Sequence, residues 1–262
     1  MNTLQIVDSH CHLNDPKFQG DFEDVLTRAE QAGVSHMTTI CTSLGEFEEV
    51  AAIAEAHAHI YASLGIHPHE VEKEAHVTYD DIAKHAVHPK VIGIGETGLD
   101  FYYEHSPRAL QEKFFRMHCA VARDFDLPVI VHTRDADDDT IRILREESQG
   151  GKLRGLIHCF TAGQKLADAV QELGFSISIS GIISFKNAVE LQETVKTIPL
   201  EKLLIETDAP YLAPVPHRGK RNEPSFVYHV AAALAELKGV TIAELAKVTT
   251  ENYFNLFTKL SC

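Results

Sequence analysis

Two histidines near the start of the chain are spaced to bind one metal ion. His10 and His12 lie in Gln5–Leu13, which begins with β-branched apolar residues and is therefore predicted to be a strand. Side chains i and i+2 share one face of a strand, so both imidazoles point the same way and Cys11 points away. Neutral imidazole suits zinc and other transition metals. Surface or hydrogen-bonded core histidines can have the same spacing, so the pair alone leaves both interpretations open.

Metal-binding residue types recur at the ends of other apolar runs. Glu96, His132 and His158 each lie at the end of such a run, and Asp208 follows the last one. We predict that two divalent ions are held by six residues: His10, His12, Glu96, His132, His158 and Asp208. The simplest division gives His10, His12 and Asp208 to one ion. His132 and His158 then bind the other, and Glu96 bridges the two because a carboxylate has two oxygens.

Further polar residues belong to the same predicted site. His67, in a Gly-Ile-His-Pro-His segment, and Arg134, on the face of His132, follow two of the apolar runs. Asp8 and Glu206 face inward one layer deeper. We predict that these two carboxylates fix histidine tautomers as hydrogen-bond acceptors. The alternative is a buried carboxylate without a catalytic role.

Alternating strands and helices must position these residues. The predicted strands are Gln5–Leu13, His36–Thr42, Ile60–Gly65, Val91–Glu96, Leu127–Thr133, Gly155–Phe160, Phe175–Ser180 and Lys202–Thr207. Most are continuous apolar runs, which is typical of parallel strands covered on both faces. Eight strands alternating with helices predict an α/β fold, a (β/α)8 TIM barrel forming one domain over residues 1–262. Its catalytic residues would lie at the carboxyl ends of the strands. A doubly wound open sheet is the alternative.

Composition limits the function classes. The 262 residues include 24 Lys and Arg against 38 Asp and Glu, a formal net charge of −14. This argues against a large electrostatic footprint on duplex nucleic acid, but not against a phosphate substrate, because bound divalent ions invert the potential locally. No apolar run is long enough for a membrane span, and no secretory leader is recognisable. Five cysteines without CxxC spacing predict a reduced, cytoplasmic protein. No apolar stripe in the sequence argues for assembly, so a monomer is the default.

A glycine pattern could be mistaken for a nucleotide site. Gly93, Gly95 and Gly98 match the dinucleotide fingerprint. That fingerprint must open a helix, whereas here Leu99–Tyr103 follows and the nearest predicted helix cap is Ser106. We therefore predict no nucleotide cofactor.

One basic segment follows the last predicted strand. It runs from His217 to Pro224 and should overhang the same end of the barrel. We predict that it recognises phosphate through Arg218, Lys220, Arg221 and Asn222. A solvated loop is the alternative.

With these residues in hand, the chain resembles the TatD-type metal-dependent deoxyribonucleases of the amidohydrolase superfamily over essentially its whole length. The resemblance lies in segments 8–13, 65–69, 93–100, 128–136, 158–160, 206–212 and 218–224. It implies a cytoplasmic barrel hydrolase that uses Mg²⁺, Mn²⁺ or Zn²⁺, with metal ligands at the same six positions. Some relatives act on aminoacyl-tRNA esters.

The leading hypothesis is phosphodiester hydrolysis from single-stranded or frayed DNA ends by a metal-activated water. Asp208 would take the water's proton, and Arg134 and the basic segment would neutralise the phosphate. His67 would protonate or hydrogen-bond the leaving oxygen. Glu96 would act as the shared ligand. One alternative is a deacylase or amidohydrolase acting on esters or amides such as D-aminoacyl-tRNA. Another is a nucleic-acid-binding barrel without turnover.

Overall fold

Eight parallel strands form one sheet in which sequence order and spatial order coincide. The structure, a computed structural model, describes residues 4–261. The strands are β1 (Ile6–Cys11), β2 (Val34–Thr39), β3 (Ile60–Leu64), β4 (Val91–Asp100), β5 (Val129–Arg134), β6 (Gly155–Ile157), β7 (Ser176–Ile179) and β8 (Leu203–Ile205). Consecutive neighbours exclude the doubly wound alternative, which reverses its strand order. The predicted (β/α)8 barrel is confirmed.

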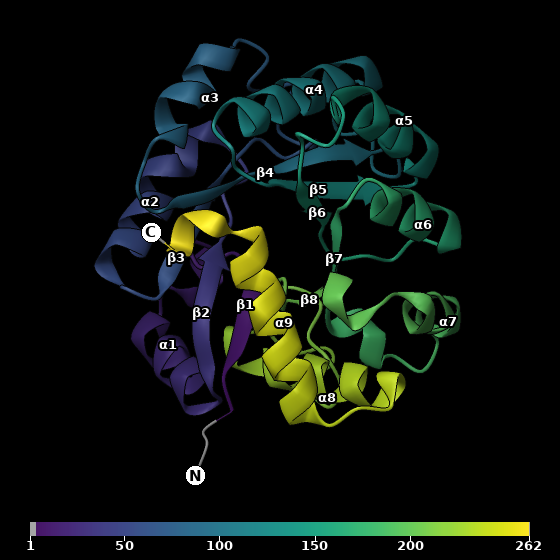
Figure 1. The fold of residues 1–262 in the computed structure, drawn as a ribbon. Coiled ribbons are helices and arrows are strands. Elements are labelled where there is room, and N and C mark those ends of the chain that lie inside the picture. Colours follow the sequence, from purple (N-terminus) through teal and green to yellow (C-terminus); the bar gives the residue numbers. More distant parts are fainter. Residues whose placement is uncertain (1–3, 262) are drawn as a thin grey trace.

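Helices surround the strands on the outside (Figure 1). They are α1 (Phe22–Gln31), α2 (Phe47–Ala56), α3 (Tyr79–Ala86), α4 (Arg108–Asp124), α5 (Asp137–Glu147), α6 (Gln164–Glu172), α7 (Val189–Thr197), α8 (Val227–Lys238) and α9 (Ile242–Leu256). Ser106 does not cap α4 as predicted. Its hydroxyl instead donates to the carbonyl of His69 and accepts the amide of Glu72, which ties this helix start to the loop after β3.

The barrel closes between β1 and the segment that follows β8. The Asp208 amide donates to the His10 carbonyl at 2.9 Å, and the His12 amide donates to the Ala209 carbonyl at 2.7 Å. An isolated parallel bridge joins Cys11 to Ala209. The first and last strands therefore meet at the same end of the barrel at which both carry predicted metal ligands.

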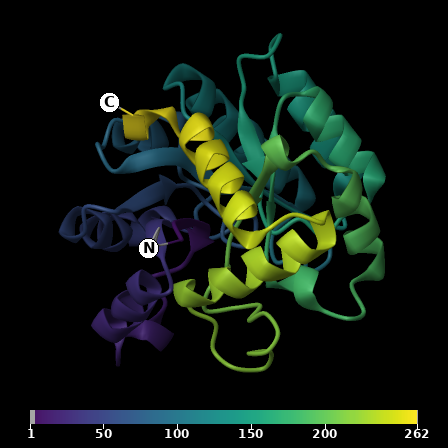
Figure 2. The ribbon, with the colours of Figure 1, turned by 60° about the horizontal axis from the view of Figure 1, so that its bottom comes forward.

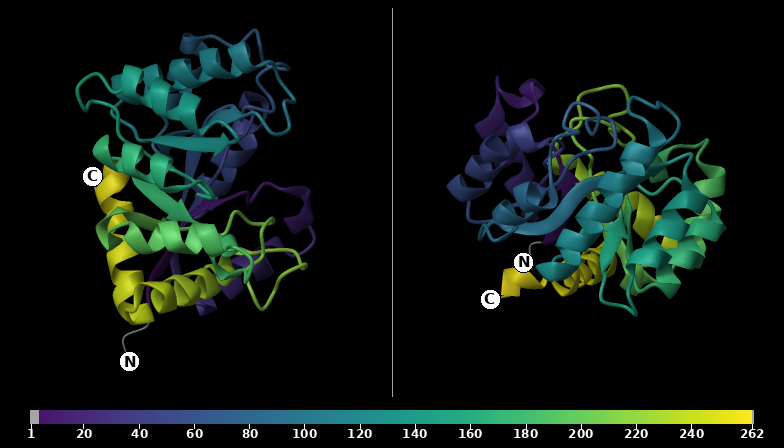
Figure 3. Two further views of the ribbon diagram at one scale, coloured as in Figure 1. Left: turned by 90° about the vertical axis from the view of Figure 1, so that its right-hand side faces the viewer. Right: turned by 90° about the horizontal axis from the view of Figure 1, so that it is seen from above.

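Helix α9 fills the opposite end of the barrel. Tyr253, Leu256 and Phe257 pack with inward-facing aliphatic residues near the starts of the strands, such as Val7 and Ile130. Figure 2 and the left view of Figure 3 show α9 lying away from the loop between β8 and α8. A site inside this barrel can therefore open only at the carboxyl ends of the strands. Within the described residues, no single helix is long and apolar enough to cross a membrane, and one bent pair, Pro224–Lys238 with Ile242–Leu256, passes by length and composition alone.

Strand β4 is longer than predicted, and its glycines explain why. The predicted strand ended at Glu96, but β4 continues to Asp100 beside β5. Gly98 has φ +132°, and a Cβ there would lie 2.0 Å from the carbonyl oxygen of His132. Gly95 has φ +149°, and its Cβ would lie 2.5 Å from the carbonyl oxygen of Ile130. The glycine pattern thus serves the close approach of two strands.

Replacing Gly98 should therefore destabilise the barrel. Gly98→Ala forces a β-carbon against β5 and into an unfavourable φ, so we expect the free energy of unfolding to fall by about 2–4 kcal/mol. Urea denaturation followed by circular dichroism measures the change. Gly20→Ala is the matched control, because nothing lies within 4 Å of its Cβ. Equal stability of the two variants would contradict this account of the glycine pattern.

Candidate metal centre

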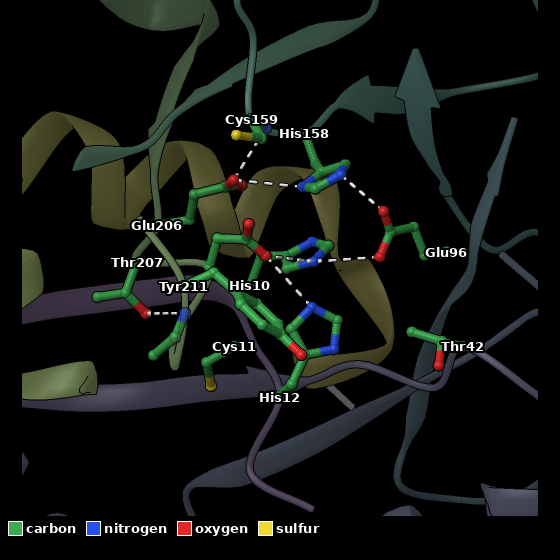
Figure 4. A network of polar contacts seen from close by, with 12 residues as sticks. His10, Cys11, His12, Thr42, Glu96, His158, Cys159, Glu206, Thr207 and Tyr211 are labelled. Carbon is green, nitrogen blue, oxygen red and sulfur yellow. Dashed lines mark hydrogen bonds and ion pairs between the residues drawn. The ribbon is translucent and has the colours of Figure 1, made fainter. Parts of the chain in front are cut away.

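The six predicted ligands converge at the carboxyl ends of the strands. His10, Glu96 and His132 belong to β1, β4 and β5, whereas the other three ligands directly follow β1, β6 and β8. Five of them line one cavity of about 1010 Å³, and His10 lies fully buried beneath it. Figure 4 shows the ligands from β1, β4 and β6 pointing toward one another.

The first group of ligands consists of His10, His12 and Asp208. Asp208 Oδ1 lies 3.5 Å from Nε2 of His10 and 3.2 Å from Nε2 of His12. The backbone hydrogen bonds that close the barrel bring these residues together although they are almost 200 positions apart in the sequence. The three atoms form a compact cluster that could hold a metal ion.

Glu96 faces both groups of histidines. Its Oε2 lies 3.4 Å from Nε2 of His10, whereas its Oε1 lies 2.8 Å from Nε2 of His158 and 3.2 Å from Nδ1 of His132. His67 joins this second group with Nε2 at 3.4 Å from Oε1, and His67, Glu96 and His132 could also hold an ion. The two oxygens of one carboxylate therefore point toward separate sets of imidazoles, the arrangement that a bridging ligand requires.

Glu206 supports the second group from behind. Its Oε1 accepts a hydrogen bond from Nδ1 of His158 at 3.3 Å and from the amide of Cys159 at 2.8 Å. The proton of a neutral His158 is thereby held on Nδ1, and the lone pair of Nε2 faces Glu96. This contact agrees with the predicted role of Glu206.

Asp8 does not play the role that the sequence predicted. Its carboxylate accepts the Thr207 amide at 2.9 Å, the Thr207 hydroxyl at 2.5 Å and the backbone amide of His10 at 3.3 Å, and no imidazole. Burial raises the pKa of Asp8 to about 8 despite the hydrogen bonds from Thr207. Asp8 braces β1 against the end of β8, so it positions the ligands through the backbone.

Asp100 is a residue of the site that sequence reasoning missed. Its Oδ2 accepts hydrogen bonds from Nε2 of His69 at 2.9 Å and from Nε2 of His132 at 3.1 Å. Burial opposes charge on Asp100, but the hydrogen bonds from His132 and His69 hold its pKa below the usual value. The period of two from Glu96 through Gly98 to Asp100 was the available signal, and it was lost because the predicted strand stopped at Glu96.

The buried cluster pairs charged carboxylates with imidazoles. Burial would raise the pKa of Glu96, but the imidazoles of His158 and His67 hold it well below its usual range, so Glu96 is charged. Burial also opposes charge on His158, but Glu96 and Glu206 raise its pKa well above the usual value. The pKa of His10 is lowered, chiefly by burial and then by repulsion from His158.

The donor set fits metal ions. Neither ring nitrogen of the buried His10 has a hydrogen-bond partner among the described residues. When the two rings are neutral, Asp100 and Glu206 fix tautomers that leave Nδ1 of His132 and Nε2 of His158 without protons, and these nitrogens lie 3.4 Å apart. Ligands of one tetrahedral ion at about 2.1 Å are separated by about 3.4 Å. Facing lone pairs at such a separation suit a cation between them.

Arg134 lies exposed at the edge of the cavity. Its guanidinium carbon is 4.1 Å from the ring centroid of Tyr102 and 4.8 Å from that of Tyr103. It is therefore the predicted phosphate-binding cation that the structure places closest to the ligands, since it shares their cavity.

The basic segment is placed differently from the prediction. Arg221 forms paired hydrogen bonds with Asp21 at 2.7 Å, and the buried Asn222 donates to the carbonyls of Thr207 and Tyr211. The guanidinium of Arg218 packs on a phenylalanine ring at 4.3 Å, and Lys220 is exposed. None of the four is among the described residues that line the cavity. Arg221 and Asn222 instead hold the loop against β8 and the segment before α1.

Comparison with known proteins identifies a family of metal-dependent hydrolases. Residues 7–258 match the family described as TatD related DNase. An Escherichia coli protein described as the uncharacterized metal-dependent hydrolase YcfH is 41% identical over 255 residues, covering 96% of this chain and 95% of the relative. The 3'-5' ssDNA/RNA exonuclease TatD of Escherichia fergusonii is 35% identical over 256 residues, covering 95% and 98%.

The fold of a solved relative is also shared. The crystal structure of YJJV, a TatD homologue from Escherichia coli, superposes with a TM-score of 0.91 at 31% identity, covering 98% of this chain and 99% of that one. The chain belongs to the TatD related DNase family and is a metal-dependent hydrolase.

Proposed function

We propose that this hydrolase cleaves phosphodiester bonds at the ends of single-stranded DNA, including frayed duplex ends. The observation that carries the proposal is Glu96, whose two oxygens face separate groups of imidazoles at the floor of one open cavity. Residues grouped in this way would hold two divalent ions, which would supply the charge stabilisation that an in-line displacement at phosphorus needs. The nuclease name of the Escherichia fergusonii relative supports the same substrate class.

Six side chains hold the two ions in this proposal. His10, His12 and Asp208 bind one ion, His132 and His158 bind the other, and Glu96 is shared. Zinc, manganese or magnesium is the proposed metal; nitrogen ligands favour the first two. Bound divalent ions supply Lewis acidity, which activates water near neutral pH and offsets charge on the phosphoryl oxygens.

The other residues move protons or bind the phosphate. Asp208 accepts the proton of the attacking water, and its pKa is lowered by hydrogen bonding to His12 and by nearby imidazoles against the effect of burial. His67 accepts the His69 amide at Nδ1, so the neutral ring carries its proton on Nε2, inside the cavity. From there it donates a hydrogen bond to the leaving oxygen. Burial lowers the pKa of His67 well below its usual value, which keeps the ring neutral.

Phosphate binding is divided between the cavity and its surroundings. Arg134 neutralises the phosphate in the cavity, and Arg218 and Lys220 contact the strand outside it. Arg221 and Asn222 serve the substrate indirectly, because their polar atoms already hold the loop in place.

Four reduced cysteines, Cys11, Cys41, Cys119 and Cys159, are consistent with action in the cytoplasm, and a monomer stays the proposed state.

Hydrolysis of an aminoacyl ester is the second candidate. Four carboxylates line the cavity besides the ligands: Asp15, Glu46, Glu49 and Glu70. A negative rim favours a substrate with an ammonium group, such as the aminoacyl end of a D-aminoacyl-tRNA. The same metal centre would serve this reaction, since the Lewis acid polarises a carbonyl as well as a phosphoryl oxygen.

Loss of Asp208 should abolish turnover. Asp208→Asn removes both a ligand and the proposed proton acceptor, so we expect the rate to fall by about 10²–10⁴-fold or more. The assay adds Mg²⁺, Mn²⁺ or Zn²⁺ to metal-stripped protein with an end-labelled single-stranded oligonucleotide. The exposed Asp80 gives a matched control, Asp80→Asn. Wild-type protein that binds metal but shortens no strand would refute the nuclease proposal, and hydrolysis of aminoacyl esters would then favour the second candidate.

Loss of Glu206 should weaken metal binding without removing a ligand. Glu206→Gln loosens the tautomer and orientation of His158, and such a change lowers metal affinity by about 10–100-fold. Calorimetric titration of metal-free protein with Zn²⁺ or Mn²⁺ measures it. Glu236→Gln, at an exposed position on α8, is the control. Unchanged metal affinity in Glu206→Gln would contradict the idea that the hydrogen bond from His158 to Glu206 contributes to metal binding.

Metal affinity should also decrease as the pH is lowered. His158 has a raised pKa, so it carries a proton in the metal-free protein, and this proton must leave before the nitrogen can bind an ion. Glu96 and Asp208 have lowered pKa values and stay ionised, so they do not offset the effect. The dissociation constant should rise about tenfold or more per pH unit between about pH 8 and pH 6. Titrations at several pH values test this, and a flat profile would contradict it.

A further inference from the structure

Two adjacent tyrosines and one arginine form an exposed surface at the edge of the cavity. Tyr102 is 57% exposed and Tyr103 is 50% exposed, and both directly follow β4. The guanidinium of Arg134, at the end of β5, lies over both rings. Tyr103 and Arg134 line the cavity that contains the metal ligands. We call these three residues the tyrosine–arginine platform.

The platform is unusual for its exposure. Most large apolar side chains of this protein are buried, and among the described residues only seven are prominently exposed. Two of these seven are neighbours in the sequence and are joined by a cation. Exposed tyrosine rings beside a guanidinium provide flat π surfaces and a positive charge, which together bind a nucleobase and its phosphate.

One carboxylate ties the platform to the metal centre. Oδ1 of Asp100 accepts the backbone amides of Tyr102 at 3.1 Å and Tyr103 at 2.9 Å, while its Oδ2 accepts from His69 and His132. The ring of His69 also packs edge-on against that of Tyr103, with centroids 5.5 Å apart. Asp100 therefore binds both the backbone of the platform and the ring of the predicted metal ligand His132, which fixes the platform beside the metal centre.

Charge gives a reason for stacking in this protein. The net charge is −14, and two arginines near the cavity, Arg28 and Arg221, are paired with Asp21 and Glu223. Few cations are therefore free to neutralise a row of phosphates, which is the usual source of non-specific affinity for nucleic acid. Base–aromatic stacking provides affinity without that charge and tolerates any base, because every base has a π face.

We propose that the tyrosine–arginine platform stacks a nucleobase of the nucleotide next to the scissile bond. This inference rests on the proposed nuclease function and assigns its binding subsite. A paired base cannot leave its stack without cost, so the platform selects single-stranded or frayed ends. Stacking does not read base edges, so the platform confers little sequence preference.

The test compares two double variants with wild type. Tyr102→Ala/Tyr103→Ala removes both rings, and Tyr102→Phe/Tyr103→Phe keeps them. With metal-loaded protein and end-labelled single-stranded DNA, the alanine pair should raise KM by about 5- to 150-fold with little change in kcat. The phenylalanine pair should stay near wild type. Tyr228→Ala, at an exposed ring on α8, should change neither value.

Oligonucleotides that lack single bases provide a second readout. Fluorescence anisotropy measures binding of a labelled strand whose terminal linkages are phosphorothioates, with one abasic residue moved along its end. We expect one abasic position to weaken binding to wild type but not to the alanine pair. If no position weakens wild-type binding, or if the alanine pair binds the intact strand as tightly as wild type, the platform proposal is overturned.

These results separate the platform from the proposed function. If wild type cleaves DNA and the alanine pair keeps its KM, the platform proposal fails and the nuclease proposal stands. If wild type cleaves no DNA, the nuclease proposal fails, and weaker strand binding by the alanine pair still supports a stacking platform. Absence of strand binding by wild type overturns both.

Discussion

The buried negative charge of Glu96 is the constraint on which the centre depends. Glu96 is 3% exposed, and a charge removed from water is costly unless it is paired or bound to a metal. Imidazoles of His10, His132 and His158 surround it. Asp100 and Glu206 hold the rings of His132 and His158 from the far side. Histidines alone offset this charge only by taking up protons. Divalent cations offset it fully and leave the imidazoles neutral.

The barrel supplies the rigidity that such a centre needs. The hydrogen bond from the Asp208 amide to the His10 carbonyl closes the barrel. The same bond sets the distance between these two predicted ligands. Asp8 reinforces the same junction through Thr207. Because α9 fills the other end with apolar side chains, water and substrate reach the ligands from the open cavity only. Barrel closure and ligand geometry thus depend on the junction between β1 and the segment after β8, and access to the site depends on α9.

Sequence predicted the fold and the convergence of ligands well, and it failed where partners are distant. Alternating apolar runs and helices gave the barrel, and polar residues at the ends of those runs gave the six converging ligands. Asp100 was missed because glycines let β4 continue beyond its apolar run. Arg221 was assigned to phosphate because its true partner, Asp21, lies 200 positions earlier. Periodicity reports the face on which a side chain lies, but it carries no information about which residue will meet it.

The distribution of charge links the centre to its substrate. Most of the surface is acidic, whereas positive charge at the cavity comes from Arg134 and, when bound, from the ions. Four further carboxylates also line the cavity, so attraction for a phosphate there depends on Arg134 and on bound ions. The rings of Tyr102 and Tyr103 lie edge to face at this side of the cavity, where the proposed platform accepts an unpaired base. The acidic composition therefore argues against broad electrostatic binding to nucleic acid, and it is compatible with the proposed action on one phosphodiester at a time.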